Sequence, residues 1–344
     1  MIDQKIVSII PRLINSLIDK GQDYHDCDVD LSLLAQGTYN KNYLLTVGTE
    51  SYVVRVNIEQ QSGEPEQLKR EYEILKYLSS KLNVPAPVFL DTDTNTFENG
   101  LLLLRYIPGY QPEPSIGIAK QIARVLAKLH NISLPKLETN SRFCSYSITS
   151  TLELCKSLYG RLHNRLNNKT TLRLYGKMLS IAVSVVKKLG QTELESLSII
   201  HGDPVPSNFL VRTDNHEIAM IDWETYAICN WTYDLWAVLS PAYNRWSWSR
   251  AFTSKEKALL VGEYCQNRGI DQKVAYHLLK HVDPLYSLRY SLWCLHKHLD
   301  YIEGRISKEL LEDGGEKNFQ KMLSTSRIAL EHASISCRKF SNEV

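Results

Sequence analysis

The sequence predicts an α+β protein with two lobes. We expect an N-terminal lobe, residues 1–107, built on an antiparallel sheet with one main helix, and a larger, mostly helical C-terminal lobe, residues 108–344. Segments rich in β-branched and aromatic residues are concentrated in the first third of the chain. After Pro108 and Gly109 the apolar residues recur mainly at helical spacing. The length of 344 residues also exceeds what one hydrophobic core usually serves.

After an N-terminal helix, the N-terminal lobe contains four predicted strands and one main predicted helix. Residues 43–47 and 51–58 flank a short turn and are dense in β-branched and aromatic residues, which predicts a hairpin. A helix is expected to begin near Pro65, because proline suits the first turn and leucines then follow at helical spacing. Residues 87–91 and 101–107 supply two further strands, the second apolar enough to be buried on both faces.

The C-terminal lobe is predicted from helical periodicity and from helix-capping signals. Ser115 is a candidate cap for a first helix, and further helical patterns cover roughly residues 148–165 and 171–189. Thr253 begins a capping box for a later helix. Pro284 predicts a break in the helical pattern near the end of the chain, because proline removes a backbone donor.

The composition excludes several classes of protein. Lys and Arg number 40 against 38 Asp and Glu, and no block of like charge appears, which argues against a nucleic-acid or membrane partner. The seven cysteines are scattered and never spaced as a metal knuckle, which is typical of reduced thiols. Residues 1–21 form an amphipathic helical pattern rather than a signal peptide. We therefore expect a cytoplasmic protein with no obligate protein partner.

Three polar residues in the second half of the chain suggest a site for metal-bound phosphates. Asp203 and Asn208 lie five residues apart on a proline-rich loop, and Asp222 follows the next predicted strand, residues 217–221. In such an arrangement of side chains, one acid accepts the proton of a hydroxyl. The amide and the other acid bind Mg²⁺ through hard oxygens. The spacing of His201, Asp203 and Asn208 also matches the catalytic loop of kinases.

The segment HGDPVPSNFLV, followed by IAMIDWE and WTYDLW, resembles the aminoglycoside phosphotransferase and choline kinase superfamily. These are small-molecule kinases with a bilobal protein-kinase-like fold, and the resemblance extends over about residues 30 to 240. It implies that Asp203 is the catalytic base or orienting acceptor. It also implies that Asn208 and Asp222 bind Mg²⁺ beside ATP, with GTP as an alternative nucleotide.

The resemblance also implies a nucleotide site in the first third of the chain. Its parts are a phosphate-covering hairpin, a strand cation paired with a helix acid, and a hinge whose backbone binds adenine. The residues assigned to the nucleotide are Gly37, Asn40, Arg55, Glu71, Arg105, Ile107, Asn208 and Asp222. Two positions depart from the pattern: Arg55 stands where protein kinases have lysine, and Arg105 stands where the family usually has an acid, so only backbone contacts are expected there.

Four further polar residues near these motifs are interpreted as follows. His201 is expected to brace the catalytic loop, and Asp234 to tie the backbone of that loop to a helix. His130, near the end of a predicted helix, is interpreted as a C-terminal cap. Glu224 is left open between a contact to a second metal ion and a solvent-exposed role.

The predicted activity is phosphoryl transfer from ATP to a hydroxyl of a small molecule. Asp234 follows Asp222 by only twelve positions, which leaves no room for the segment on which protein kinases hold a peptide. The additional helices would instead enclose a compact acceptor and exclude water. The alternative is a catalytically inactive pseudokinase that binds nucleotide or acts as a scaffold.

The class of acceptor stays open between an aminoglycoside-like polycation, a choline-like amino alcohol and a sugar. A polycation calls for several carboxylates, and choline calls for aromatic rings. The candidate carboxylates are Asp283, Asp300, Glu303, Glu309, Glu312 and Asp313, and the candidate aromatics are Trp246, Trp248, Tyr286, Tyr290 and Trp293. Tyr286, Tyr290 and Trp293 share one helix face, which indicates either core packing or an aromatic wall for a cation.

Overall fold

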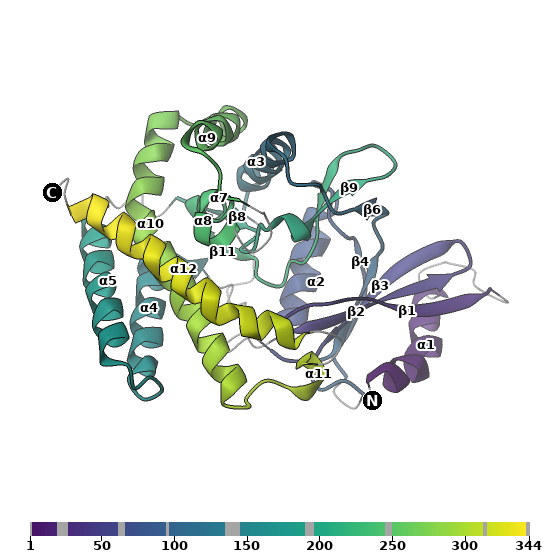
Figure 1. Cartoon of the computed structure of the whole chain (residues 1–344). Helices are drawn as coiled ribbons and strands as arrows, with labels where there is room; N and C mark the ends of the chain where they lie inside the picture. The colour runs from purple at the N-terminus through teal and green to yellow at the C-terminus, as the bar shows by residue number, and fades with distance from the viewer. Residues whose placement is uncertain are drawn as a thin grey trace. The chain divides into compact units, whose positions relative to one another are not determined.

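A computed structural model describes most of the chain (Figure 1). The described residues are 2–18, 27–60, 66–93, 96–134, 145–189, 196–244, 250–311 and 315–341. The predicted helix start at Pro65 and the candidates Trp246, Trp248, Glu312 and Asp313 lie outside the described residues. Among the described residues, every helix is too short or too polar to serve as a membrane span.

The chain divides into two compact units. The N-terminal unit comprises residues 1–109, 212–224 and 304–318. The C-terminal unit comprises residues 110–211, 225–303 and 319–344. Asp222 therefore belongs to the N-terminal unit, whereas Asp203 and Asn208 belong to the C-terminal unit.

The N-terminal unit is built on a five-stranded sheet in which all neighbouring strands are antiparallel. The order across the sheet is β1 (Val29–Gln36), β2 (Asn40–Val47), β3 (Glu50–Asn57), β5 (Leu101–Arg105) and β4 (Pro87–Asp91). A tight turn joins β2 to β3, and Gly48 provides the positive φ of 59° that this turn requires. The predicted hairpin and the two later strands are confirmed.

The two faces of this sheet differ because side chains alternate along each strand. One face packs against α1 (Ile2–Ile18) in an apolar cluster that contains Ile6, Leu13, Tyr52, Val54 and Val56. Residues of β3 between these, including Arg55, project from the opposite face. α2 (Gln67–Leu78) contacts β4 and β5 and buries polar as well as apolar side chains. The unit also contains β10 (Ile218–Met220) and α11 (Lys308–Leu311).

The C-terminal unit is mostly helical. Its helices are α3 (Ile116–Asn131), α4 (Ile148–Leu162), α5 (Lys169–Lys188), α7 (Thr232–Leu239), α8 (Pro241–Asn244), α9 (Ser254–Arg268), α10 (Gln272–Ile302) and most of α12 (Glu316–Ser341). α10 packs against α4, α5, α7 and α9, and Figure 1 shows α4 and α5 side by side along it. The short elements are β7 (Ser145–Tyr146), β8 (Leu197–Ile200), the 3-10 turn η1 (Pro206–Asn208) and β11 (Ala227–Asn230). β11 lies between β7 and β8 in a small sheet, and β6 (Gly109–Tyr110) and β9 (Phe209–Arg212) lie where the chain passes between the units.

The structure confirms the predicted α+β class and the predicted caps. Ser115 accepts a hydrogen bond from the backbone of Ile118 over 3.2 Å, and Thr253 begins a complete capping box. The predicted break at Pro284 is wrong, because α10, which is 31 residues long, continues through this proline. Val282 and Leu285 on either side of the proline are fully buried, so packing outweighs the loss of one backbone hydrogen bond.

Candidate active site

Arg55 lies on β3, the middle strand of the five-stranded sheet, and its side chain is 5% exposed. It pairs across the sheet with Asn42 on β2, and its Nε donates to Oδ1 of Asn42 over 3.1 Å. This contact fixes the guanidinium at Nε. The two terminal nitrogens, Nη1 and Nη2, are therefore oriented toward other partners.

Two carboxylates from different segments bind those terminal nitrogens. Nη1 of Arg55 lies 2.5 Å from Oε1 of Glu71 on α2, and Nη2 lies 2.9 Å from Oδ1 of Asp222. Burial works to lower the pKa of Arg55, but the charges of Glu71, Asp222 and Glu224 outweigh it and raise the pKa. Burial raises the pKa of Glu71 while Arg55 opposes that effect, so each side chain of the pair depends on the other for its charge.

Asp222 adopts a backbone conformation that is rare outside glycine. Its φ is 64°, in the left-handed region, and its side chain is 30% exposed. The next residue, Trp223, is completely buried, and its Nε1 donates to the carbonyl oxygen of Met220 over 3.1 Å. This anchor holds the turn after β10 and thereby directs the Asp222 carboxylate toward Arg55. Unfavourable backbone geometry that the surroundings enforce is common at functional sites.

Glu224 belongs to a network of amide side chains in the N-terminal unit. Asn40 donates to its Oε2 through a short hydrogen bond, and Gln67 donates to the same oxygen over 3.3 Å. Oδ1 of Asn40 accepts in turn from Asn57 over 2.8 Å. Asn40, expected in the phosphate-covering turn, is the first residue of β2, and its side chain is buried in this network. The turn itself is closed by the backbone N–H of Gly37, which donates to the carbonyl oxygen of Asn40 over 2.9 Å.

The predicted hinge lies at the end of β5. The side chain of Arg105 pairs with Glu50 at 2.8 Å, and the backbone N–H of Arg105 donates to the carbonyl oxygen of Ala86 over 2.9 Å. The N–H of Tyr106 donates to Ser51 over 3.1 Å, and Ile107 is buried. The backbone N–H groups of Arg105 and Tyr106 are therefore already used for hydrogen bonds within the N-terminal unit.

In the C-terminal unit, Asp203 and Asn208 contact each other directly. Nδ2 of Asn208 donates to Oδ2 of Asp203 over 3.1 Å and to its carbonyl oxygen over 2.9 Å. The second carboxylate oxygen, Oδ1, accepts a short hydrogen bond from the hydroxyl of Tyr243 on α8. The Asp203 carboxylate is half-buried, and both of its oxygens are held by donors from the same unit.

The loop that carries Asp203 is fixed from behind by Asp234, which is completely buried. The backbone N–H groups of His201 and Gly202 donate to its two oxygens over 2.7 and 2.9 Å. Gly202 has a φ of 83°, and a Cβ atom there would stand 2.1 Å from the carbonyl oxygen of Thr225. Only glycine therefore suits this position. Asp234 ties the loop to α7, as the sequence suggested.

His130 supports Asp234 and is not the helix cap that the sequence suggested. Its Nε2 lies 3.2 Å from Oδ2 of Asp234, and its Nδ1 lies 2.7 Å from the hydroxyl of Tyr264. The side chain is buried, and burial lowers the pKa of the imidazole although Asp234 opposes this. A neutral ring, with Nε2 protonated and Nδ1 accepting from Tyr264, satisfies both contacts.

Aromatic rings surround Tyr243. Its ring centroid lies 4.5 Å from that of Tyr290 on α10 and 5.9 Å from that of Trp236 on α7. Tyr290 stacks with Trp293 at 6.2 Å, whereas Tyr286 is fully buried and its hydroxyl meets Thr232. The geometry thus favours core packing for Tyr286 and brings Tyr290 close to the residue that binds Asp203.

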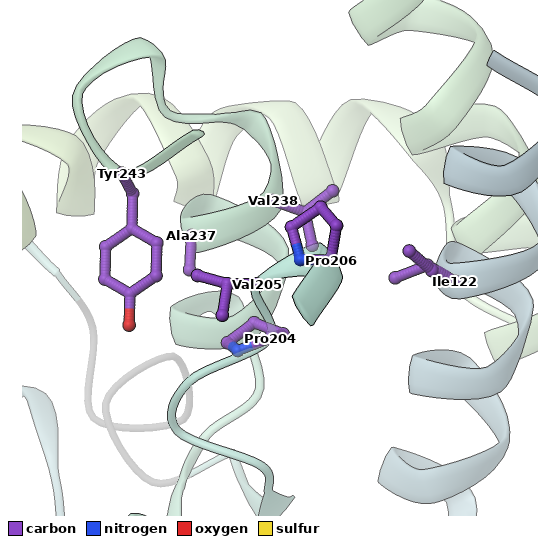
Figure 2. Close-up of a pocket in the computed structure, with 7 residues that line it drawn as sticks. All are labelled: Ile122, Pro204, Val205, Pro206, Ala237, Val238 and Tyr243. Carbon is purple, nitrogen blue, oxygen red and sulfur yellow. The ribbon is translucent and has the colours of Figure 1, made fainter. Parts of the chain in front are cut away.

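The Tyr243 ring also borders a small apolar pocket. Figure 2 shows Tyr243 at one edge and Ile122 at the opposite edge, with residues of the proline-rich loop between them. The remaining lining residues are Pro204, Val205, Pro206, Ala237 and Val238. The cavity measures about 10 Å³, which is near the minimum for a single water molecule, so it is too small to be a substrate site.

The predicted site residues thus form two groups. Arg55, Glu71 and Asp222 meet in the N-terminal unit, and Asp203 meets Asn208 in the C-terminal unit. Sequence reasoning missed Tyr243, because no local spacing indicates a contact between residues forty positions apart.

A comparison with protein-family models decides the family. The model of the phosphotransferase enzyme family (APH) matches residues 30–274. The chain belongs to this phosphotransferase family. A search of curated proteins found no significant match.

Solved structures show that the phosphotransferase shares the fold of kinases that act on small molecules. Choline kinase from Cryptosporidium parvum Iowa II is 15% identical, with a TM-score of 0.62 over 92% of this chain and 90% of the other. Choline kinase LicA from Streptococcus pneumoniae is 19% identical, with a TM-score of 0.59 over 94% and 99% of the two chains. The ADP-bound aminoglycoside phosphotransferase APH(2'')-Ib is 17% identical, with a TM-score of 0.56 over 92% and 98%. At this level of identity the similarity shows the fold.

Proposed function

We propose that this phosphotransferase is a small-molecule kinase that moves the γ-phosphoryl group of ATP to a hydroxyl group. The proposal depends on one observation, namely how the carboxylate of Asp203 is held in place. Its carboxylate is held by Asn208 and Tyr243, on a loop whose backbone is fixed by the buried Asp234. A binding module has no chemical need for such a fixed acceptor of a hydroxyl proton, which favours the enzyme over the pseudokinase alternative.

In the proposed reaction, the acceptor hydroxyl donates a hydrogen bond to the carboxylate of Asp203. The acceptor oxygen forms a bond to the γ-phosphorus, and the bond from that phosphorus to the bridging oxygen breaks, with its electron pair staying on ADP. The hydroxyl proton passes to Asp203. Because the transition state of phosphoryl transfer is loose, positioning and charge neutralisation are expected to supply most of the rate.

Arg55 is proposed to bind the phosphates of the nucleotide, with Glu71 positioning it. The charges around Arg55 raise its pKa, so the guanidinium stays positive at any physiological pH. Asn42 and Glu71 together fix Nε and Nη1 of Arg55, so the cation is preorganised for a phosphate oxygen. ATP is the proposed donor and GTP the alternative, with the backbone of Arg105 and Ile107 proposed for the base and Gly37 for the loop that covers the phosphates.

Asn208 and Asp222 are proposed as ligands of Mg²⁺. Both hydrogen bonds of Asn208 to Asp203 use Nδ2, which leaves the amide oxygen Oδ1 as the atom suited to a hard cation. The Asp222 carboxylate is partly exposed, as a ligand must be. When bound, the cation would neutralise charge on the phosphate oxygens.

The partners of several C-terminal carboxylates favour a compact acceptor over a polycation. Asp300 and Glu303 both pair with Arg165, at 2.7 and 3.0 Å. These two acids are therefore already engaged within the C-terminal unit, and the single charge of Arg165 balances one of their two negative charges.

Asp283 is also engaged, in a polar cluster that links α10 to α7 and α12. Trp236 Nε1 donates to its Oδ1 over 2.6 Å, His332 lies 3.2 Å from the same oxygen, and Ser336 donates to Oδ2 through a short hydrogen bond. Burial works to raise the pKa of Asp283, but these partners outweigh it and lower the pKa. A compact alcohol such as an amino alcohol or a sugar is the proposed acceptor.

The substitution Asp203→Asn tests the proposed activity. It keeps the shape of the side chain but removes the proton acceptor, so turnover should fall by a factor of about 10² to 10⁴. Nucleotide affinity, measured as the thermal shift with ATP and MgCl₂, should stay near the wild-type value. The matched control is Asp214→Asn, at an exposed position paired with Arg212 on a turn of the N-terminal unit.

The assay is ATP consumption against pools of amino alcohols, sugars and aminoglycosides. Consumption by the wild type that depends on an acceptor, and that disappears in the Asp203 variant, supports the kinase. Ordinary turnover in the Asp203 variant would refute the role of that residue. A thermal shift without consumption in any pool would favour the pseudokinase.

A further inference from the structure

The hydroxyl of Tyr243 is hydrogen-bonded to one of the two carboxylate oxygens of Asp203, the proposed base. It donates to Oδ1 of Asp203 through a short hydrogen bond, while Asn208 donates to Oδ2. An acceptor hydroxyl has to make the same kind of contact with the same carboxylate. The phenol therefore stands where the hydroxyl of a substrate is expected.

Tyr243 is held in this position as a neutral donor. Its side chain is 7% exposed, and its ring packs between those of Tyr290 and Trp236. Burial, followed by the charge of Asp203, raises the pKa of the phenol well above its ordinary value. The proton consequently stays on Tyr243, and Asp203 is the acceptor of the hydrogen bond.

We propose that Tyr243 is a positioning residue that occupies the place of the acceptor on Asp203 in the resting protein and so suppresses hydrolysis of the nucleotide. This role rests on the proposed function, and it would let the enzyme favour a substrate hydroxyl over water as the acceptor. A substrate hydroxyl displaces the phenol because the rest of the substrate contributes binding energy. Water has no such additional contacts and competes poorly for the same oxygen.

The suppressed side reaction is transfer of the γ-phosphoryl group to water. A water oxygen forms a bond to the γ-phosphorus, and the bond from that phosphorus to the bridging oxygen breaks, with its electron pair staying on ADP. One proton of the water passes to Asp203 and then to solvent, so the products are ADP and inorganic phosphate. The reaction needs only ATP, Mg²⁺ and water.

The test is Tyr243→Phe, which keeps the ring between Tyr290 and Trp236 and removes only the hydroxyl. The release of inorganic phosphate from ATP and MgCl₂ without an acceptor should rise about tenfold, since a hydrogen bond to a charged group is lost from the resting state. The KM for the acceptor should fall while kcat changes less. The double variant Tyr243→Phe with Asp203→Asn should lose the added hydrolysis.

The matched control is Tyr175→Phe. Tyr175 on α5 is a buried tyrosine whose hydroxyl meets Ser291 at 2.7 Å and Ser326 at 3.2 Å instead of a carboxylate. It should leave hydrolysis unchanged. Thermal unfolding of both variants shows whether each is folded.

Unchanged hydrolysis in folded Tyr243→Phe would overturn the proposal, as would a parallel fall of hydrolysis and transfer. Failure of the proposed function has a different signature, namely a wild type that consumes no ATP with any acceptor. Hydrolysis that rises in the variant would still support the role of Tyr243 in that case.

Discussion

Asp234→Asn should loosen the catalytic loop without touching any group that is proposed to contact substrate. The wild-type carboxylate accepts from two backbone N–H groups and from His130, and it is completely buried. Asparagine offers one oxygen, so one of the two backbone donors at His201 and Gly202 is left facing an NH₂ group. An unsatisfied buried donor costs about 1–3 kcal/mol, and replacing a charged acceptor by a neutral one costs about 1 kcal/mol more. We expect a loss of about 3 kcal/mol.

The assay is native-state hydrogen exchange of the peptide that covers residues 199–208, together with urea unfolding. A loss of about 3 kcal/mol corresponds to a decrease in the protection of the His201 and Gly202 amides by a factor of about 10². Asp214→Asn, an exposed change, is the control and should leave this peptide unchanged. Protection within a factor of about two of the wild type would refute the role assigned to Asp234.

Three further changes test other parts of the site. Glu71→Gln leaves the buried Arg55 without its partner on α2, so the free energy of unfolding measured in urea should fall by about 3–5 kcal/mol, whereas a change below about 1 kcal/mol would contradict a buried ion pair. Gly202→Ala forces a Cβ against the backbone of Thr225 at a positive φ, so it should lower stability by at least about 2 kcal/mol and turnover with it, and a fully active alanine variant would contradict this geometry. Asp283 has a lowered pKa, so its contribution to stability is complete above the ordinary aspartate pKa of about 3.9 and is lost as the pH falls through the lower folded value. In Asp283→Asn this acid-dependent part should disappear from unfolding free energies compared at about pH 6 and about pH 3, and an unchanged pH dependence would exclude Asp283 as its source.

Local signals in the sequence were sufficient to predict most of the fold. Two segments dense in β-branched and aromatic residues around a glycine turn predict the hairpin of β2 and β3, and side-chain caps predict the starts of α3 and α9. The continuation of α10 through Pro284 could not be predicted in the same way. It depends on buried contacts with helices that are distant in sequence, and these override a local preference.

The site was predictable only as far as its motifs extend. The family resemblance implies that Arg55 on a strand pairs with Glu71 on the following helix, and the structure shows that contact. The inward orientation of Asn40 and the contact between Tyr243 and Asp203 depend on tertiary packing, for which the sequence carries no periodic signal. His130 was predicted as a helix cap but supports the buried Asp234, and this contact likewise depends on tertiary packing.

The central position of α10 constrains the order in which the nascent chain can fold. α4, α5, α7 and α9 all precede α10, and each has an apolar side that α10 covers. The N-terminal unit likewise includes residues 304–318. The ribosome synthesises the chain from the N-terminus at about 5–20 residues per second. The apolar surfaces of these helices therefore stay exposed until α10 has been synthesised. Productive expression should accordingly benefit from chaperones that shield nascent chains.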